Sequence, residues 1–198
     1  MERFQSQFPF VCALTAFFPR PLTPPPHPPP HTTLACSLDM LPFGRQAPGA
    51  HPCQYTHDEQ RFIMTLWSIA RSPLILGAVL PLDANDTWTL PLVTNAAVLA
   101  VNAYSCGNAP TQVLNSDPSQ LAAWSATAQG DGSVSVYALF NLREAPATIS
   151  VAVPEEPGQG ALCVTDLWSG AVDALPPGGT LARAVNAHAG GMWSVGPC

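Results

Sequence analysis

The chain has 198 residues and a formal net charge of -6, with thirteen acidic residues, seven arginines and no lysine. No basic stripe is present to neutralise phosphates, which excludes nucleic acid as a partner. The composition is 47% hydrophobic and 10% charged, which is too apolar for a wholly disordered chain and too interrupted for a membrane span. We therefore expect a largely globular protein of one or two domains.

The first 37 residues differ from the rest in composition. The apolar run Phe8–Phe18 has the length of a signal-peptide core, but no small-residue cleavage site follows it. Residues 19–33 are rich in proline, which forbids a helix, so His27 and His31 are predicted to be solvated rather than to bind a metal. Residues 1–37 are expected to form a disordered leader.

The cysteines and one tripeptide bear on the cellular compartment. None of the six cysteines forms a CxxC pair, so a zinc site is not supported, while disulfides of unknown connectivity remain open. Asn85-Asp86-Thr87 fits the N-glycosylation sequon, which matters only in a secretory compartment; a chance match is the alternative.

Local signals in the middle of the chain predict alternating helices and a strand. Thr56-His57-Asp58-Glu59 reads as a capping box that starts a helix over about 57–71, which Ser72-Pro73 ends. The apolar run Leu74–Leu80 predicts a strand that is covered on both faces in a parallel sheet. Residues 87–102 read as two short helices, with Pro91 in a first turn and Asn95 as a cap.

After Gly107 the hydrophobic period becomes two. Residues 134–140 alternate between the two faces of a predicted strand, and a Gly-Asp-Gly turn precedes them. Further strands are expected at 148–153, 161–168 and 187–195, separated by clusters of proline and glycine. This spacing favours an antiparallel sandwich.

Several stretches carry a family resemblance. They are DMLPFGR at 39–45, DEQR at 58–61 with MTLWSIARSPL at 64–74, LVTN at 92–95 with VLAVN at 98–102, and ALFNL at 138–142 with DLWSG at 166–170. In order and spacing they resemble the family 27 glycoside hydrolases of the α-galactosidase type. The resemblance covers about 38–195 and starts abruptly at Asp39, which indicates a mispredicted gene start or a retained intron; a genuine truncated product is the alternative.

The resemblance implies a fold and a domain organisation. The fold class is α/β plus all-β: the C-terminal remnant of a (β/α)8 barrel over 38–106, followed by an antiparallel β-sandwich domain over 107–198. The family is implied to be retaining, with one carboxylate as nucleophile and a second as acid and base. Both are aspartates on earlier barrel strands, so no catalytic residue, metal or cofactor is assigned to this chain.

Candidate binding residues also follow from the resemblance. Asp39 and Met40 match positions that line the galactose pocket, where a carboxylate can accept hydrogen bonds from sugar hydroxyls. Two departures weaken an inherited site: Gly77-Ala78-Val79 stands where the family has Gly-Gly-Asp, and Ala103 replaces the usual glutamine.

The remaining candidate residues have structural explanations. Asp58 and Glu59 are expected to cap a helix, and Asp83 and Asp86 to form a turn and a cap. Three further side chains are expected to serve packing or a turn rather than sugar stacking or catalysis; these are Trp67, Trp88 and His188.

Three functional hypotheses remain. In the first, the chain is the C-terminal fragment of an α-galactosidase-like enzyme, inactive alone and secreted or vacuolar/lysosomal, which would hold an α-galactoside or another carbohydrate if its pocket were completed. In the second, it is a noncatalytic β-sandwich module that binds carbohydrate or protein. In the third, it is a secreted proline-rich wall protein. The oligomeric state is left open.

Overall fold

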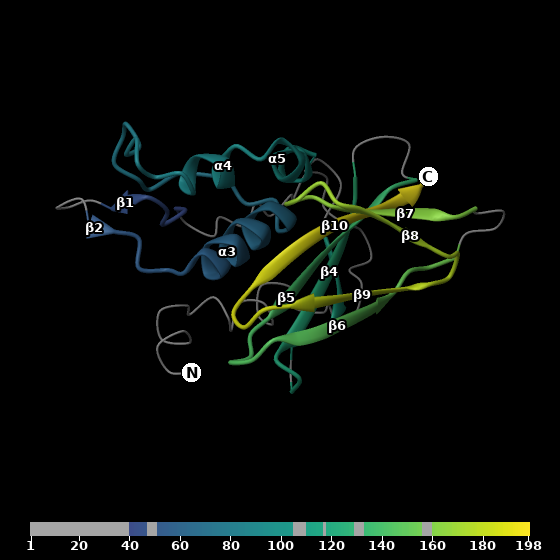
Figure 1. Cartoon of the computed structure of the whole chain (residues 1–198). Helices are drawn as coiled ribbons and strands as arrows, with labels where there is room; N and C mark the ends of the chain where they lie inside the picture. Colours follow the sequence, from purple (N-terminus) through teal and green to yellow (C-terminus); the bar gives the residue numbers. More distant parts are fainter. Residues whose placement is uncertain (1–39, 47–50, 105–109, 117, 129–132, 156–159) are drawn as a thin grey trace, which may run out of the picture.

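The computed structural model describes residues 40–46, 51–104, 110–116, 118–128, 133–155 and 160–198 (Figure 1). The expected leader at 1–37 and the candidate residue Asp39 lie outside these ranges. Along the described chain, two short strands come first, three helices follow, and an antiparallel β region comes last. In the part of the chain that the structure describes, no helix combines the length and apolar character needed to cross a membrane.

Helix α3 (His57–Ile69) begins at the predicted capping box. The backbone N–H of Glu59 donates to Thr56 Oγ1 at 3.2 Å, and the N–H of Thr56 donates to Glu59 Oε2 at 2.7 Å. The helix ends two residues earlier than expected, because Arg71 adopts a φ of 60°. A residue in the left-handed region stops the helical repeat before the Ser72-Pro73 boundary is reached.

The two predicted short helices are present. Helix α4 spans Thr89–Val93 and α5 spans Ala96–Ala103. Asn95 caps α5 as expected, since its Oδ1 accepts from the N–H of Val98 at 3.1 Å. The cap of α4 comes from Asp86, whose Oδ1 accepts from the N–H groups of Trp88 at 3.1 Å and Thr89 at 2.8 Å.

The prediction of a strand at Leu74–Leu80 is wrong in one respect. It is not a regular strand covered on both faces: Leu76 forms an isolated parallel bridge with Leu41, and Ile75 and Leu80 are 51% and 70% exposed. Leu74 and Leu76 pack against the core on one face of the segment, whereas Ile75 is exposed on the other face. The parallel direction of the Leu41–Leu76 bridge agrees with the expectation, whereas a second isolated bridge, between Gln46 and Ala78, is antiparallel.

Two hydrogen bonds define this parallel contact. The N–H of Leu41 donates to the carbonyl of Ile75 at 2.7 Å, and the N–H of Gly77 donates to the carbonyl of Leu41 at 2.9 Å. Helix α3 is the connection between the two paired segments, which is the arrangement of a βαβ crossover. Strands β1 (Arg45–Gln46) and β2 (His51–Pro52) form a small antiparallel pair within this connection, before α3.

The β region contains two antiparallel sheets. The larger has the order β3-β4-β5-β10-β7-β8 and the smaller pairs β6 with β9 (Figure 1). The strands are β3 Thr111–Leu114, β4 Leu121–Thr127, β5 Ser135–Asn141, β6 Ala147–Ala152, β7 Leu162–Asp166, β8 Val172–Leu175, β9 Thr180–Val185 and β10 Gly190–Pro197. Strands β5, β6, β7 and β10 were predicted within a few residues, whereas β3, β4, β8 and β9 were not individually predicted.

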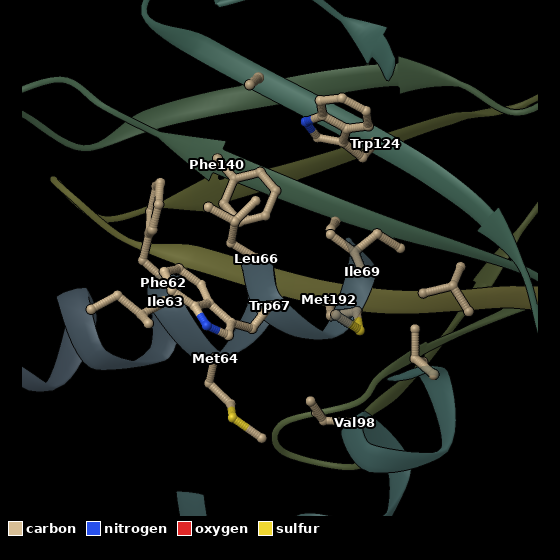
Figure 2. Packing of buried hydrophobic residues seen from close by; sticks show 14 of the residues in the cluster. Phe62, Ile63, Met64, Leu66, Trp67, Ile69, Val98, Trp124, Phe140 and Met192 are labelled. Carbon is tan, nitrogen blue, oxygen red and sulfur yellow. The ribbon is translucent and has the colours of Figure 1, made fainter. Parts of the chain in front are cut away.

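The larger sheet is covered on both faces. Val136, Ala138 and Phe140 of β5 belong to a core shared with α3, while Tyr137 and Leu139 belong to a second core with β6 and β9. Phe62 of α3 packs on Phe140 with ring centroids 4.9 Å apart. Figure 2 shows side chains of α3 pointing toward the strands of the sheet, and Met64 pointing to the opposite side of the helix. One continuous core therefore joins the helical region to the sheet.

Covalent and polar links reinforce this packing. The Arg71 guanidinium donates to the carbonyls of Val101 and Tyr104 at the end of α5, and to the carbonyl of Thr127 in β4 at 3.3 Å. Cys163 of β7 is disulfide-bonded to Cys198. The cysteine pairing that the sequence left open is thus settled for these two residues.

Candidate functional site

An open cleft of about 480 Å³ lies at the start of α3, between the connection that follows Leu41 and the connection that follows Leu76. Its lining comes from residues 44–45 and 52–53, the first turn of α3, and the segment 83–89. In α/β barrels, connections that follow parallel strands build the functional face. The cleft is therefore the candidate functional site of the described residues.

Two carboxylates of the cleft accept hydrogen bonds from nearby backbone N–H groups. Asp83 Oδ1 accepts from the N–H of Asn85 at 2.9 Å, and its Oδ2 lies 3.7 Å from Arg45 Nη1. Asp86 caps α4 as described above. The expectation that turn formation and capping account for both acids is confirmed by these bonds.

The environment of Asp86 favours its charged form. Partial burial by itself would raise its pKa, but hydrogen bonds from the hydroxyl and N–H of Thr89 and from the N–H of Trp88 outweigh this effect and lower the pKa. A carboxyl with a lowered pKa stays ionised and is a poor proton donor near neutral pH. Asp86 therefore fits a cap and not a general acid.

Gln60 is a polar residue at the bottom of the cleft that the sequence analysis did not single out. Its side chain is only 5% exposed, and Nε2 donates to the carbonyl of Tyr55 at 2.8 Å. Its Oε1 has no hydrogen-bond partner among the residues that the structure describes. A buried acceptor without a partner is uncommon. Gln60 stands between Glu59 and Arg61 in the sequence, so no local apolar pattern marked it as buried.

Trp88 packs against α3. The His57 ring stacks on it with centroids 4.0 Å apart and planes 6° apart, and Arg61 Cζ lies 5.5 Å from its centroid. Trp67 is 3% exposed within the core. These placements confirm the interpretation of both tryptophans as packing residues.

Cys53 is the thiol of the cleft. Its Sγ donates to the carbonyl of Pro42 at 2.9 Å. Burial is the main cause that raises its pKa, and the negative charges of Glu59 and Asp86 add to this effect. Because the thiolate is the nucleophilic form, a raised pKa makes Cys53 an inert thiol rather than a nucleophile.

Of the two residues that the resemblance places at a sugar, the structure describes only Met40. Asp39 lies outside the described residues, so its position is not tested. Met40 is 55% exposed and lies beside Gly77. A Cβ atom added to Gly77 would be 3.6 Å from the Cβ of Met40. Met40 is therefore next to the parallel bridge and outside the lining of the cleft.

Most other described carboxylates have structural partners. Asp58 accepts from Asn186 at 3.1 Å, and Glu144 pairs with His188 at 3.0 Å in a turn, as expected for that histidine. Asp166 accepts from the N–H of Trp168, and Asp173 pairs with Arg183 at 2.9 Å. Within the described ranges, no group of three or more histidine, cysteine or acidic residues could hold a metal.

Comparison with known proteins identifies the relationship. No protein-family model matches the chain. An α-galactosidase of Cyamopsis tetragonoloba is 28% identical over 144 residues, which cover 72% of this chain. A family 27 β-L-arabinopyranosidase of Geobacillus stearothermophilus superposes with a TM-score of 0.67 at 29% identity over 82% of this chain. The chain is similar to the family 27 glycoside hydrolases.

The match to family 27 covers the C-terminal part of its enzymes. A putative α-N-acetylgalactosaminidase of Bacillus halodurans has a TM-score of 0.69 at 26% identity, and this chain covers 82% of itself but 39% of that protein. The chain spans 33% of the Cyamopsis enzyme and 37% of the arabinopyranosidase. The resemblance predicted from the motifs is thus confirmed, while the barrel remnant and the boundary at 106/107 stay predictions.

Proposed function

We propose that residues 40–198 form the C-terminal part of an α-galactosidase-like glycoside hydrolase, whose complete form hydrolyses terminal α-galactosides. The observation that carries this proposal is the parallel pairing of Leu41 with Leu76 across α3, followed along the chain by two short helices and then the antiparallel sheets. The similarity to family 27 enzymes over 82% of the chain supports it.

In this proposal the segments at 38–106 are the last units of a (β/α)8 barrel and 107–198 are the β domain. A barrel strand has a neighbour on each side. The exposure of Ile75, Val79 and Leu80 on a short parallel pair fits strands whose other neighbours belong to polypeptide outside these residues. The shared core of α3 and the larger sheet then joins the barrel to the β domain.

The catalytic carboxylates are proposed to come from other barrel strands. Retaining glycosidases need two carboxyl groups about 5 to 5.5 Å apart across the glycosidic bond. Asp83 and Asp86, the acids of the cleft, serve a turn and a cap, and the thiol of Cys53 is not activated. Residues 1–198 by themselves are therefore proposed to be inactive.

Asp39 and Met40 are proposed to contribute to the sugar pocket of the completed enzyme. A carboxylate accepts hydrogen bonds from sugar hydroxyls, and a thioether offers a flexible apolar surface. Met40 is exposed beside the parallel pair, where it is accessible to a ligand bound next to the missing strands.

The compartment is proposed to be secretory, either the cell exterior or a vacuolar or lysosomal lumen. The Cys163–Cys198 disulfide supports this, because disulfides form and persist in oxidising compartments.

The alternative of a free-standing β-sandwich module receives less support. Strands β5 and β10 of the larger sheet are covered by α3 on one face and by the β6–β9 pair on the other. A ligand that binds a sheet face needs that face to be open, and both faces of these central strands are covered among the described residues. The cleft lies instead on the helical side of the molecule.

Sequencing transcripts across the codons for Leu38 and Asp39 tests the proposed relationship. We expect transcripts in which earlier barrel strands, including two aspartates at strand ends, precede Asp39 in frame. Transcripts that all join the proline-rich leader to Asp39, with no barrel sequence at the locus, would contradict the proposal.

A further inference from the structure

The tripeptide Asn85-Asp86-Thr87 lies in the turn between the parallel pair and α4. The N–H of Asp86 donates to the carbonyl of Asp83 at 2.9 Å, and the N–H of Asn85 donates to Asp83 Oδ1 at 2.9 Å. Asn85 and Thr87 are both exposed. The sequon motif therefore occupies a surface turn, which is where a bulky glycan can be carried without disturbing a core.

The three residues of this tripeptide differ in what they do for the fold. Asp86 is engaged, because its carboxylate caps α4. The side-chain amide of Asn85 and the hydroxyl of Thr87 have no hydrogen-bond partner in the part of the chain that the structure describes. The fold thus accounts for the middle residue, and it leaves free the two side chains that define the sequon.

An independent observation concerns the compartment. Cys163 and Cys198 are disulfide-bonded, and such bonds are typical of proteins that pass through an oxidising lumen. In eukaryotic cells the transfer of N-linked oligosaccharides takes place in that same lumen. The disulfide and the exposed sequon therefore point to the same route.

We propose that Asn85 is an N-glycosylation site. The donor is an oligosaccharide on a polyprenyl diphosphate carrier. Nδ2 of Asn85 forms a bond to the anomeric carbon of the oligosaccharide, and the bond from that carbon to the phosphate oxygen breaks. One amide proton passes to a base and the polyprenyl diphosphate leaves. No oxidant or reductant is needed.

The position of Asn85 gives the glycan a structural consequence. Asn85 belongs to the lining of the cleft, together with Asp83 and Trp88. A glycan at this residue stands at the mouth of the cleft. This inference does not depend on the proposed glycosidase function, because it rests only on the sequon, its exposure and the disulfide.

The test is expression of the full chain behind a cleavable signal peptide in eukaryotic cells, followed by glycopeptide mass spectrometry. We expect one glycan, located on Asn85. Peptide N-glycosidase should remove it and convert the released Asn85 to aspartate. Asn85→Gln and Thr87→Ala should each abolish the glycan, whereas Thr87→Ser should retain it, because serine preserves the sequon.

The controls keep the result interpretable. Thr87→Ala and Thr87→Ser alter the same exposed position, so a difference between them reports recognition of the sequon and not folding. Secreted, disulfide-bonded chain in which Asn85 is recovered unmodified would overturn the proposal. So would a glycan that persists in Asn85→Gln.

Discussion

At the scale of single residues, the side chains of the cleft are explained mostly by local backbone needs. Asp83 and Asp86 close a turn and cap a helix, and Cys53 donates to a carbonyl. Gln60 and Trp88 are exceptions, because the buried Oε1 of Gln60 and the buried Nε1 of Trp88 have no hydrogen-bond partner among the described residues. Local explanations of this kind could be predicted from the sequence, since caps and turns depend on neighbours within a few positions.

Asp86→Ala is expected to lower the free energy of unfolding by about 1 kcal/mol near neutral pH, as typical for the loss of a helix cap. Urea unfolding followed by circular dichroism measures this. The matched control is Thr87→Ala, at an exposed neighbour whose side chain makes no hydrogen bond to the described residues, which should change stability by less than about 0.5 kcal/mol.

The effect of Asp86→Ala should depend on pH. Because the folded-state pKa of Asp86 lies below its ordinary value, the stabilisation is fully present above about pH 4, the range of an unperturbed aspartate. It is lost as the pH falls through the lowered folded-state pKa. Unfolding curves at decreasing pH should therefore converge for the two proteins, and a difference that grows on acidification would contradict the assignment.

At the scale of elements, α3 has two structural roles. It connects the two segments of the parallel bridge, and it packs on one face of the larger sheet through Phe62 and its neighbours (Figure 2).

Phe62→Ala is expected to cost about 3 to 5 kcal/mol of unfolding free energy, as for other buried aromatic truncations. Leu90→Ala, at a side chain that is 55% exposed, serves as the control and should be nearly neutral. Equal effects of the two substitutions in urea unfolding would show that α3 does not pack on the sheet.

The Cys163–Cys198 disulfide ties the end of β10 to β7. For cysteines 35 residues apart, loop-closure entropy predicts a stabilisation of about 3 to 4 kcal/mol. The midpoint of urea unfolding should therefore fall on reduction. A variant with both Cys163→Ser and Cys198→Ser should unfold near the reduced midpoint and be insensitive to reductant. A reductant-independent midpoint in the unaltered chain would refute the pairing.

Elements were predictable where their signals are local. The capping box at Thr56 and the cap at Asn95 located α3 and α5, and alternation located β5. Strand β4 was missed because it is covered on both faces, so its sequence LAAWSAT does not alternate. Strand β9 was missed because Arg183 stands between Leu181 and Val185 on the same face, which interrupts the apolar alternation of its sequence. Burial of 74–80 failed as a prediction because it depends on neighbouring strands and not on the segment itself.

At the scale of the whole molecule, the family motifs predicted more than periodicity did. They anticipated the relationship to family 27, which the comparisons confirm, and the order of helices before strands. The cleft could not be predicted, because its lining joins residues 44–45 and 52–53, the start of α3 and the turn at 83–89. Such a meeting of segments depends on the tertiary fold. The division into a barrel part and a β domain remains a prediction.

The central claim is that these residues carry the C-terminal part of a glycosidase without its catalytic carboxylates. The most direct measurement is hydrolysis of an aryl α-galactoside by the purified chain of residues 1–198, beside its Asp39→Ala variant. The account predicts that neither protein raises the rate above the buffer blank at any concentration. Turnover by the unaltered chain that disappears in Asp39→Ala would contradict it.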